Sequence, residues 1–264
     1  MTAITRHPHV VIIGGFLTES FQYRPMRQRL LDAGAERATI APIHLPDWAG
    51  MGLVGLGPLL LRGARAIREA RRASPDPVIV IGHSTGGLIA RLATCETPLD
   101  GRVARVAADV GCLVTLGTPH ALEPRIRWRH AVVRAAEHLA RHCPDGYFAP
   151  DTGYLTVGSS FVRPGRAAPR HTLVQRLNAL LRDLVGETEG VGGDGLVDAQ
   201  RSRLDDVRHV ELDDILHGNV YGPWYGDSVA IERWWPPAVE EWQRALAARD
   251  HLDGLTPADA PALP

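Results

Sequence analysis

Ser84 lies in the segment VIVIGHSTGGLIARL, residues 78–92, where a run rich in β-branched residues meets glycines and then residues at helical spacing. Residues Gly82-His83-Ser84-Thr85-Gly86 follow the pattern G-x-S-x-G, which is typical of a serine held on a sharp strand-to-helix turn. Small residues two positions before and after the serine prevent clashes in such a turn, and the following helix directs its first N–H groups toward it. We therefore predict that Ser84 is a nucleophile and that the amide of Thr85 stabilises an oxyanion. The alternative is a tight turn that contains an incidental serine.

A serine hydroxyl is a poor nucleophile near neutral pH, so it needs a base within hydrogen-bond reach and a carboxylate that orients this base. The sequence contains 12 histidines that compete for the role of base. His217, in DDILHGNVYG, lies in a loop after the last predicted strand and next to a glycine. Asp194 and Asp198 lie in GVGGDGLVDAQRS, whose glycines allow a loop to bring a carboxylate beneath a histidine.

In these segments the chain resembles the α/β-hydrolase superfamily, in particular lipase-like and esterase-like members that carry a G-H-S-x-G-G elbow. The resemblance covers roughly residues 9–225 and rests on VVIIGGF at 10–16, the elbow at Ser84, VTLGTPH at 114–120, and the late aspartate and histidine. It implies a serine hydrolase whose triad follows the chain order Ser, then Asp or Glu, then His. It also implies that the first glycine turn supplies the second oxyanion N–H, which indicates Phe16, with Leu17 as the second choice.

The resemblance assigns the acid to Asp194, because G-D-G-x-V is a pattern of lipase-like members and Gly193 to Val197 match it. Asp198 is the alternative acid. A third interpretation is that Asp194 only caps backbone amides in an exposed glycine-rich turn. Asp213 and Asp214 lie too close in sequence to the histidine to be preferred.

The same resemblance assigns the base to His217, since the superfamily carries its catalytic histidine in such a late loop. His120 is the next candidate, and it is also a candidate residue of the pocket mouth. His83 adjoins the nucleophile, and we interpret it as a packing residue or one that supports the site from behind. Leu17, His83 and Trp224 are further candidates for the pocket lining.

Short apolar runs that alternate with longer helical stretches predict the elements that hold these residues. Strands are predicted at 10–13, 38–43, 77–82, 110–116, 154–160 and 208–213, and amphipathic helices at 58–73 and directly after Ser84. Strands roughly 30 to 40 residues apart with helices between them indicate a parallel sheet. We expect a single α/β-hydrolase domain over residues 1–264, with a mostly parallel central sheet, helices on both faces, a small helical cap inserted at about 119–150, and a disordered tail at about 252–264.

The composition of the 264 residues, 45% hydrophobic and 22% charged, is that of a soluble globular protein. The net charge is −1, so bulk electrostatics do not favour a nucleic acid partner. We find no signal peptide pattern and no window with the roughly 18 apolar residues of a transmembrane segment. The 3 cysteines do not make a disulfide framework and suit a reducing cytoplasm, so we expect a cytoplasmic protein.

These observations predict a serine hydrolase that cleaves a carboxylic ester with a hydrophobic acyl group through an acyl-enzyme. The expected partner is a small-molecule ester or lipid-like substrate, with no cofactor and no metal. His138 and His142 are four residues apart on a predicted helix, but their order is not that of a zinc motif. A thioesterase, amidase or acyltransferase that uses the same residues remains an alternative, as does a non-catalytic binding protein of the same fold. The oligomeric state is left open.

Overall fold

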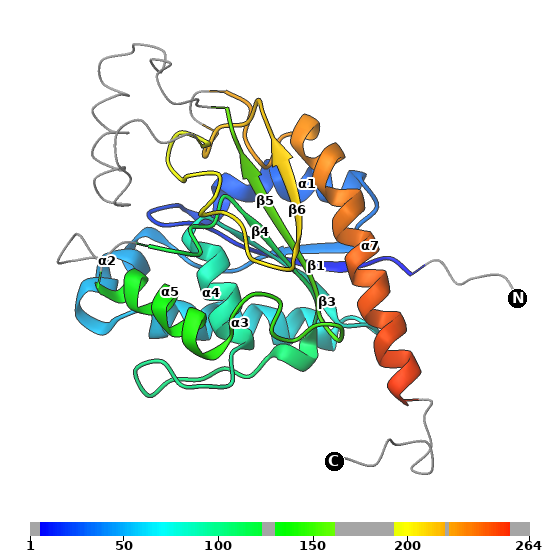
Figure 1. Cartoon of the computed structure of the whole chain (residues 1–264), viewed down its shortest axis with the longest axis horizontal. Helices are drawn as coiled ribbons and strands as arrows, with labels where there is room; N and C mark the ends of the chain where they lie inside the picture. The colour runs from blue at the N-terminus through cyan, green and yellow to red at the C-terminus, as the bar shows by residue number, and fades with distance from the viewer. Residues whose placement is uncertain (1–5, 123–129, 162–192, 220–221, 254–264) are drawn as a thin grey trace, which may run out of the picture.

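The central sheet of the computed structural model, which describes residues 6–122, 130–161, 193–219 and 222–253, has six strands, all parallel (Figure 1). Their order is β2-β1-β3-β4-β5-β6. The strands are β1 (His9–Ile13), β2 (Arg37–Ile40), β3 (Val78–His83), β4 (Val110–Leu116), β5 (Gly153–Ser159) and β6 (Arg208–Leu212). Strands β1, β3, β4 and β5 are buried at every residue, as expected where helices cover both faces of a sheet. The predicted α/β class is confirmed.

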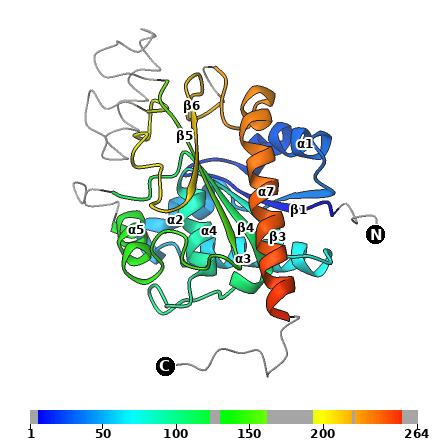
Figure 2. The same cartoon turned by 45° about the vertical axis from the view of Figure 1, so that its right-hand side comes forward.

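Helices form one layer on each face of this sheet (Figure 2). Because side chains alternate along a strand, Val11 and Ile13 of β1 face one layer while Val10 and Ile12 face the other. The first layer contains α2 (Leu45–Val54), α3 (Gly57–Arg72), α4 (Thr85–Thr94) and α5 (His130–His142). The second contains α1 (Arg24–Asp32) and α7 (Ser228–Asp253), and the short helices η1 (Ser20–Tyr23) and η2 (Ala107–Asp109) lie in connections.

Helix α5 lies within the segment 119–150 that was predicted as a cap. It packs on α4, and its residues Ala135, Ala136 and Leu139 belong to the core beneath that layer. This helix therefore covers a face of the sheet. Residues 123–129 of the predicted cap lie outside the described residues, so the cap stays a prediction there. Of the predicted tail, residues 252–253 end α7, and 254–264 lie outside the described residues.

A disulfide joins Cys95 and Cys143, which directly follow α4 and α5. Their Cα atoms are 6.1 Å apart although 48 residues separate them in sequence. The expectation that the cysteines are reduced is therefore wrong for two of the three, because the packing of two helices brings their ends together. Cys112, buried in β4, is a free thiol. Among the described residues, no helix combines the length and the apolar character needed to cross a membrane.

Candidate active site

Ser84 occupies the turn between the end of β3 and the start of α4, as the G-x-S-x-G pattern predicts. Its backbone has φ 55° and ψ −131°, a conformation that non-glycine residues rarely adopt and that marks local strain. The flanking glycines make this turn possible. A Cβ on Gly82 would come within 2.4 Å of the Cα of Gly87, and one on Gly86 would come within 2.3 Å of the carbonyl oxygen of Ile13. Backbone segments therefore approach each other so closely here that a side chain at either glycine would clash with them.

Ser84, His217 and Asp194 form a continuous hydrogen-bonded chain. His217 Nε2 lies 2.9 Å from Ser84 Oγ, and His217 Nδ1 lies 2.8 Å from Asp194 Oδ2. Since an ionised carboxylate can only accept, Nδ1 carries the ring proton and Nε2 accepts the hydrogen bond of the serine hydroxyl. The structure thus brings together three residues that are remote in sequence, with the histidine in the tautomer that can take a proton from the serine.

The Asp194 carboxylate is almost completely buried and is held by hydrogen bonds to both oxygens. Oδ1 accepts from the backbone amides of Leu196 and Val197, at 3.0 and 2.8 Å. Burial alone would raise the pKa of this carboxyl, but the charge and hydrogen bond of His217 and the two amides leave the pKa lowered. Asp194 therefore stays ionised, which is the form that orients His217.

Tyr225 contributes a further hydrogen bond that the sequence did not indicate. Its buried hydroxyl donates to Asp194 Oδ2 over 2.8 Å. Burial and the neighbouring carboxylate raise the pKa of Tyr225 well above its ordinary value, so the hydroxyl keeps the proton it donates. A tyrosine eight residues after the histidine has no distinctive local pattern, and only its position in the fold identifies it.

The glycine turn after β1 lies directly against Ser84. A Cβ on Gly15 would meet Ser84 Cβ at 2.8 Å, which places the next residue, Phe16, at the rim of the site. The Phe16 ring packs edge to face on Trp48 with 5.5 Å between ring centroids. Leu17 has φ 56° and a side chain exposed to 43%. Thr85 begins α4, where backbone N–H groups point out of the helix. The oxyanion role of Phe16 and Thr85 stays a prediction.

Three candidate pocket residues are less open than the sequence suggested. His83 and Trp224 are buried, and their rings lie edge to face with centroids 5.6 Å apart. His120 is also buried, with Nε2 3.0 Å from Thr115 Oγ1 and Nδ1 3.2 Å from an Arg91 nitrogen. Burial, reinforced by the charge of Arg91, lowers the pKa of His120 well below its ordinary value. Both ring nitrogens of His120 are therefore engaged away from the serine.

The alternative acids have other partners. Asp198 Oδ1 accepts hydrogen bonds from the amides of Gln200 and Arg201, at 2.7 and 3.3 Å, which is the capping geometry of an Asx turn. Asp213 and Asp214 are exposed and form ion pairs with Arg233. Asp194 is therefore the aspartate of this group that contacts His217.

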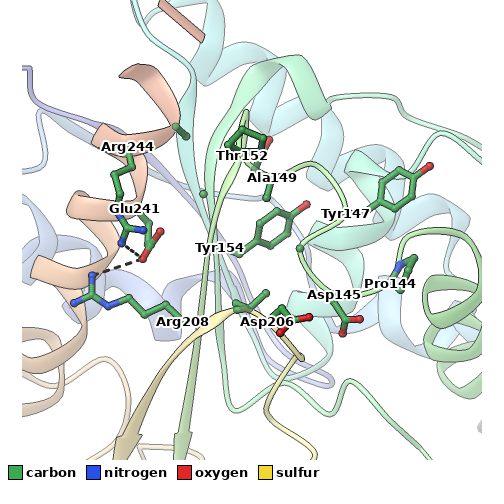
Figure 3. A pocket seen from close by; sticks show the side chains of 15 residues that line it. Pro144, Asp145, Tyr147, Ala149, Thr152, Tyr154, Asp206, Arg208, Glu241 and Arg244 are labelled. Carbon is green, nitrogen blue, oxygen red and sulfur yellow. Dashed lines mark hydrogen bonds and ion pairs between the residues drawn. The ribbon is translucent and has the colours of Figure 1, made fainter. Parts of the chain in front are cut away.

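A cavity of about 570 Å³ lies at the amino ends of the sheet strands, away from the end where Ser84 lies; Figure 3 shows its lining. Its lining includes Gly153 and Arg208, which begin β5 and β6, whereas Ser84 follows the carboxyl end of β3. On one wall of this cavity Glu241 forms ion pairs with Arg208 and Arg244. Because parallel strands place their amino ends at one edge and their carboxyl ends at the other, this cavity is not the space beside the serine.

Comparisons with known proteins point to the same fold. Residues 60–142 match the family model of the PGAP1-like alpha/beta domain. The chain is similar to a GPI inositol-deacylase of Aspergillus oryzae (strain ATCC 42149 / RIB 40), with 28% identity over 129 residues that cover 48% of this chain and 11% of the relative. Lipase BlEst2 of Bacillus licheniformis in its mature form has a similar structure, with a TM-score of 0.58, 16% identity, and coverage of 90% of this chain and 93% of the lipase. For the propeptide form of that lipase the TM-score is 0.59 at 15% identity, with coverage of 89% of this chain and 50% of the other.

The similarity in sequence and the similarity in structure differ in how much of the chain they cover. The PGAP1-like match at residues 60–142 contains the turn at Ser84 and ends before Asp194 and His217. The structural likeness to the lipase covers 90% of the chain. The chain therefore has the α/β-hydrolase fold, as its elbow and its parallel sheet indicated, and its residues 60–142 are similar to the PGAP1-like alpha/beta domain.

Proposed function

We propose that this protein hydrolyses a carboxylic ester with Ser84 as the nucleophile, His217 as the general base and Asp194 as the carboxylate that orients it. The observation that carries the proposal is the hydrogen-bonded chain of these three side chains, with 2.9 and 2.8 Å between successive partners. A base within hydrogen-bond reach of a serine, itself oriented by a third group, is the arrangement that activates a hydroxyl. No cofactor is needed for this chemistry.

In the first half of the reaction His217 Nε2 removes the hydroxyl proton while Ser84 Oγ attacks the ester carbonyl. The resulting imidazolium then gives this proton to the leaving alcohol, and an acyl-enzyme remains on the serine. In the second half His217 removes a proton from the water that attacks the acyl carbonyl and then returns it to Ser84 Oγ as the bond to the acyl group breaks, so the acid is released and the serine is regenerated. Asp194, buried and ionised, stabilises the imidazolium in both halves and keeps the ring in its orientation.

The oxyanion of each tetrahedral intermediate would be held by the amides of Phe16 and Thr85. Thr85 is the first residue of α4, so its N–H belongs to the positive end of the helix dipole. Phe16 follows the glycine that lies against Ser84. Removal of one oxyanion donor typically lowers kcat by on the order of 10² to 10³.

The substrate class in this proposal is an ester with a hydrophobic acyl group. The name of the Aspergillus relative is that of a deacylase, and the Bacillus neighbour is named as a lipase, so both names refer to acyl esters. The exposed side chain of Leu17 and the part-buried ring of Phe16 supply apolar surface on the glycine turn beside Ser84.

Labelling with a fluorophosphonate probe tests the nucleophile directly. We expect one covalent adduct on Ser84 in the folded protein and none in Ser84→Ala. Ester turnover, measured with p-nitrophenyl esters of increasing acyl length, should fall by on the order of 10⁴-fold or more in Ser84→Ala and His217→Ala. Absence of both labelling and turnover in the folded wild-type protein would reject the proposal. Acyl thioesters and amides assayed in parallel distinguish ester hydrolysis from related acyl transfers.

The two aspartates of the same loop provide a matched pair for the acid. Asp194→Asn should lower kcat by on the order of 10³ to 10⁴, because an amide can donate to Nδ1 and favours the wrong tautomer of His217. Asp198→Asn should retain most of the activity, since Asp198 caps two backbone amides and an asparagine oxygen can do the same. If the Asp198 variant were the inactive one, the acid would be reassigned.

A further inference from the structure

His83, the residue before the nucleophile, uses its two ring nitrogens in opposite ways. Nε2 lies 2.8 Å from the backbone carbonyl oxygen of His217, and a carbonyl can only accept, so Nε2 carries the proton. Nδ1 lies 2.8 Å from Tyr23 Oη and is therefore the acceptor of the tyrosine hydroxyl. One tautomer of His83 satisfies both contacts.

Tyr23 extends this chain of hydrogen bonds to the glycine turn. Its oxygen accepts from the backbone N–H of Gly15 over 2.9 Å while its hydrogen goes to His83. Thr18 Oγ1 is farther from the Tyr23 hydroxyl, at 3.4 Å, and itself donates to the carbonyl of Gly15 over 2.7 Å. A single relay therefore runs from the Gly15 N–H through Tyr23 and His83 to the His217 carbonyl.

The relay is enclosed by aromatic rings. Tyr23 is 2% exposed and His83 is 4% exposed. The Trp224 ring lies edge to face on both, at 5.8 Å from Tyr23 and 5.6 Å from His83 between ring centroids. Water cannot readily replace a partner in such a setting, so loss of one group leaves a buried donor or acceptor unsatisfied.

Burial, reinforced by the charge of His217, lowers the pKa of His83 to about 3. The ring of His83 is therefore neutral at the pH at which His217 would act. This matters because the two rings are only 4.9 Å apart between centroids, and a second positive charge would oppose formation of the His217 imidazolium.

We infer that His83 and Tyr23 are positioning residues that fix the glycine turn of the oxyanion site and the backbone of the base relative to each other. The inference rests on the proposed function, because it assigns a role to two residues that touch neither substrate nor reacting atoms. One end of the relay is the amide of Gly15, which precedes the proposed donor Phe16, and the other end is the carbonyl of His217 itself. If His83 and Tyr23 only filled space, the volumes of their rings would matter, but the donor and acceptor roles of the two His83 nitrogens would not affect the reaction.

The experiment uses Tyr23→Phe, which removes only the hydroxyl, and His83→Leu, which removes both ring nitrogens. We expect each variant to lower kcat by about tenfold or more with KM changed less than about twofold, since positioning errors act on the chemical step. The rate of fluorophosphonate labelling at Ser84 should fall in parallel. The double variant should be no slower than the slower single variant, because both substitutions break the same relay.

His83→Gln is the conservative variant, since its side-chain amide keeps one donor and one acceptor. We expect it to recover kcat to within about threefold of the wild type, which a role in packing alone would not produce. Tyr147→Phe is the matched control, because Tyr147 is exposed and lines the distant cavity. Urea unfolding of every variant identifies any that fails to fold. If His83→Leu does not fold, the comparison of Tyr23→Phe with His83→Gln still tests the inference.

Wild-type kcat and labelling in Tyr23→Phe would overturn the inference, and so would effects of the two single substitutions that multiply in the double variant. Failure of the proposed function has a different signature, because the wild-type protein itself would then neither label nor turn over esters.

Discussion

The hydroxyl of Tyr225 donates a 2.8 Å hydrogen bond to Asp194 Oδ2, the oxygen that also receives Nδ1–H of the proposed base. The two donors share one carboxylate oxygen, while the other oxygen is held by backbone amides. A buried carboxylate with four donors is fixed in both position and charge. Tyr225 thus stabilises the ionised acid without touching the serine.

We expect Tyr225→Phe to lower kcat/KM by about tenfold and to leave the protein folded. A hydrogen bond to a charged group contributes about 1.5 to 3 kcal/mol, and part of this is lost when Asp194 is less firmly held. Steady-state ester hydrolysis measures this effect, and Tyr147→Phe, an identical change at an exposed tyrosine, should leave kcat/KM unchanged.

The buried neutral histidine at position 83 predicts that stability falls as the pH falls. The folded protein binds a proton at His83 only near pH 3, because burial lowers the pKa of the ring, whereas an unfolded histidine binds it near pH 6.5. Between these values the unfolded chain carries the extra proton, so the free energy of unfolding decreases on acidification by at most about 1.4 kcal/mol per pH unit. The lowered pKa of Asp194 adds a loss in the same direction, but only below about pH 4.

Urea unfolding of the wild type and His83→Gln at pH 7.5 and pH 5.0 measures this contribution. The wild type should lose about 2 kcal/mol more than the variant between the two values, because glutamine does not titrate. His251→Gln, at an exposed position on α7, serves as the control and should behave like the wild type. Equal pH dependence of the wild type and His83→Gln would show that folding does not lower the pKa of His83 and would contradict this prediction.

The disulfide between Cys95 and Cys143 closes a loop of 48 residues, and its removal should lower the free energy of unfolding by about 4 kcal/mol. The change to make is the double variant Cys95→Ser/Cys143→Ser, with urea unfolding measured with and without reductant. Reductant should destabilise the wild type and leave the double variant unchanged. A thiol count on the unfolded wild type should give one reactive cysteine, Cys112, before reduction and three afterwards; three before reduction would contradict the disulfide.

Much of the fold could be predicted because the signal is local. The strand predicted at 110–116 is β4. The prediction at 10–13 differs from β1 by one residue at one end, and those at 77–82 and 154–160 differ from β3 and β5 by one residue at each end. These segments are nearly continuous apolar runs, which is how a strand buried on both faces reads. The strand predicted at 38–43 ends at Ile40, because the chain leaves the sheet after Ala41 bonds to Ile12. Helices α1 and α2 were not predicted, since α1 is short and α2 contains glycines that weaken a helical pattern.

The candidate site divides in the same way. Ser84 has a sequence pattern of its own, and the late Asp194 and His217 could be assigned through the superfamily resemblance. Tyr23 and Tyr225 have no such pattern, because their roles depend on contacts with residues 60 and 31 positions away. The Cys95–Cys143 pairing depends in the same way on how two helices pack. Contacts of this kind follow from the assembled sheet and could not be read from one sequence.

The backbone conformation at Ser84 serves the proposed reaction but lowers the stability of the fold. Glycine adopts a positive φ readily, so exchange of the serine for glycine would relax the turn and remove a buried polar group at once. Selection for heat resistance alone would therefore favour molecules that had lost the reactive hydroxyl, and any campaign to make this protein more robust should screen for turnover together with melting temperature.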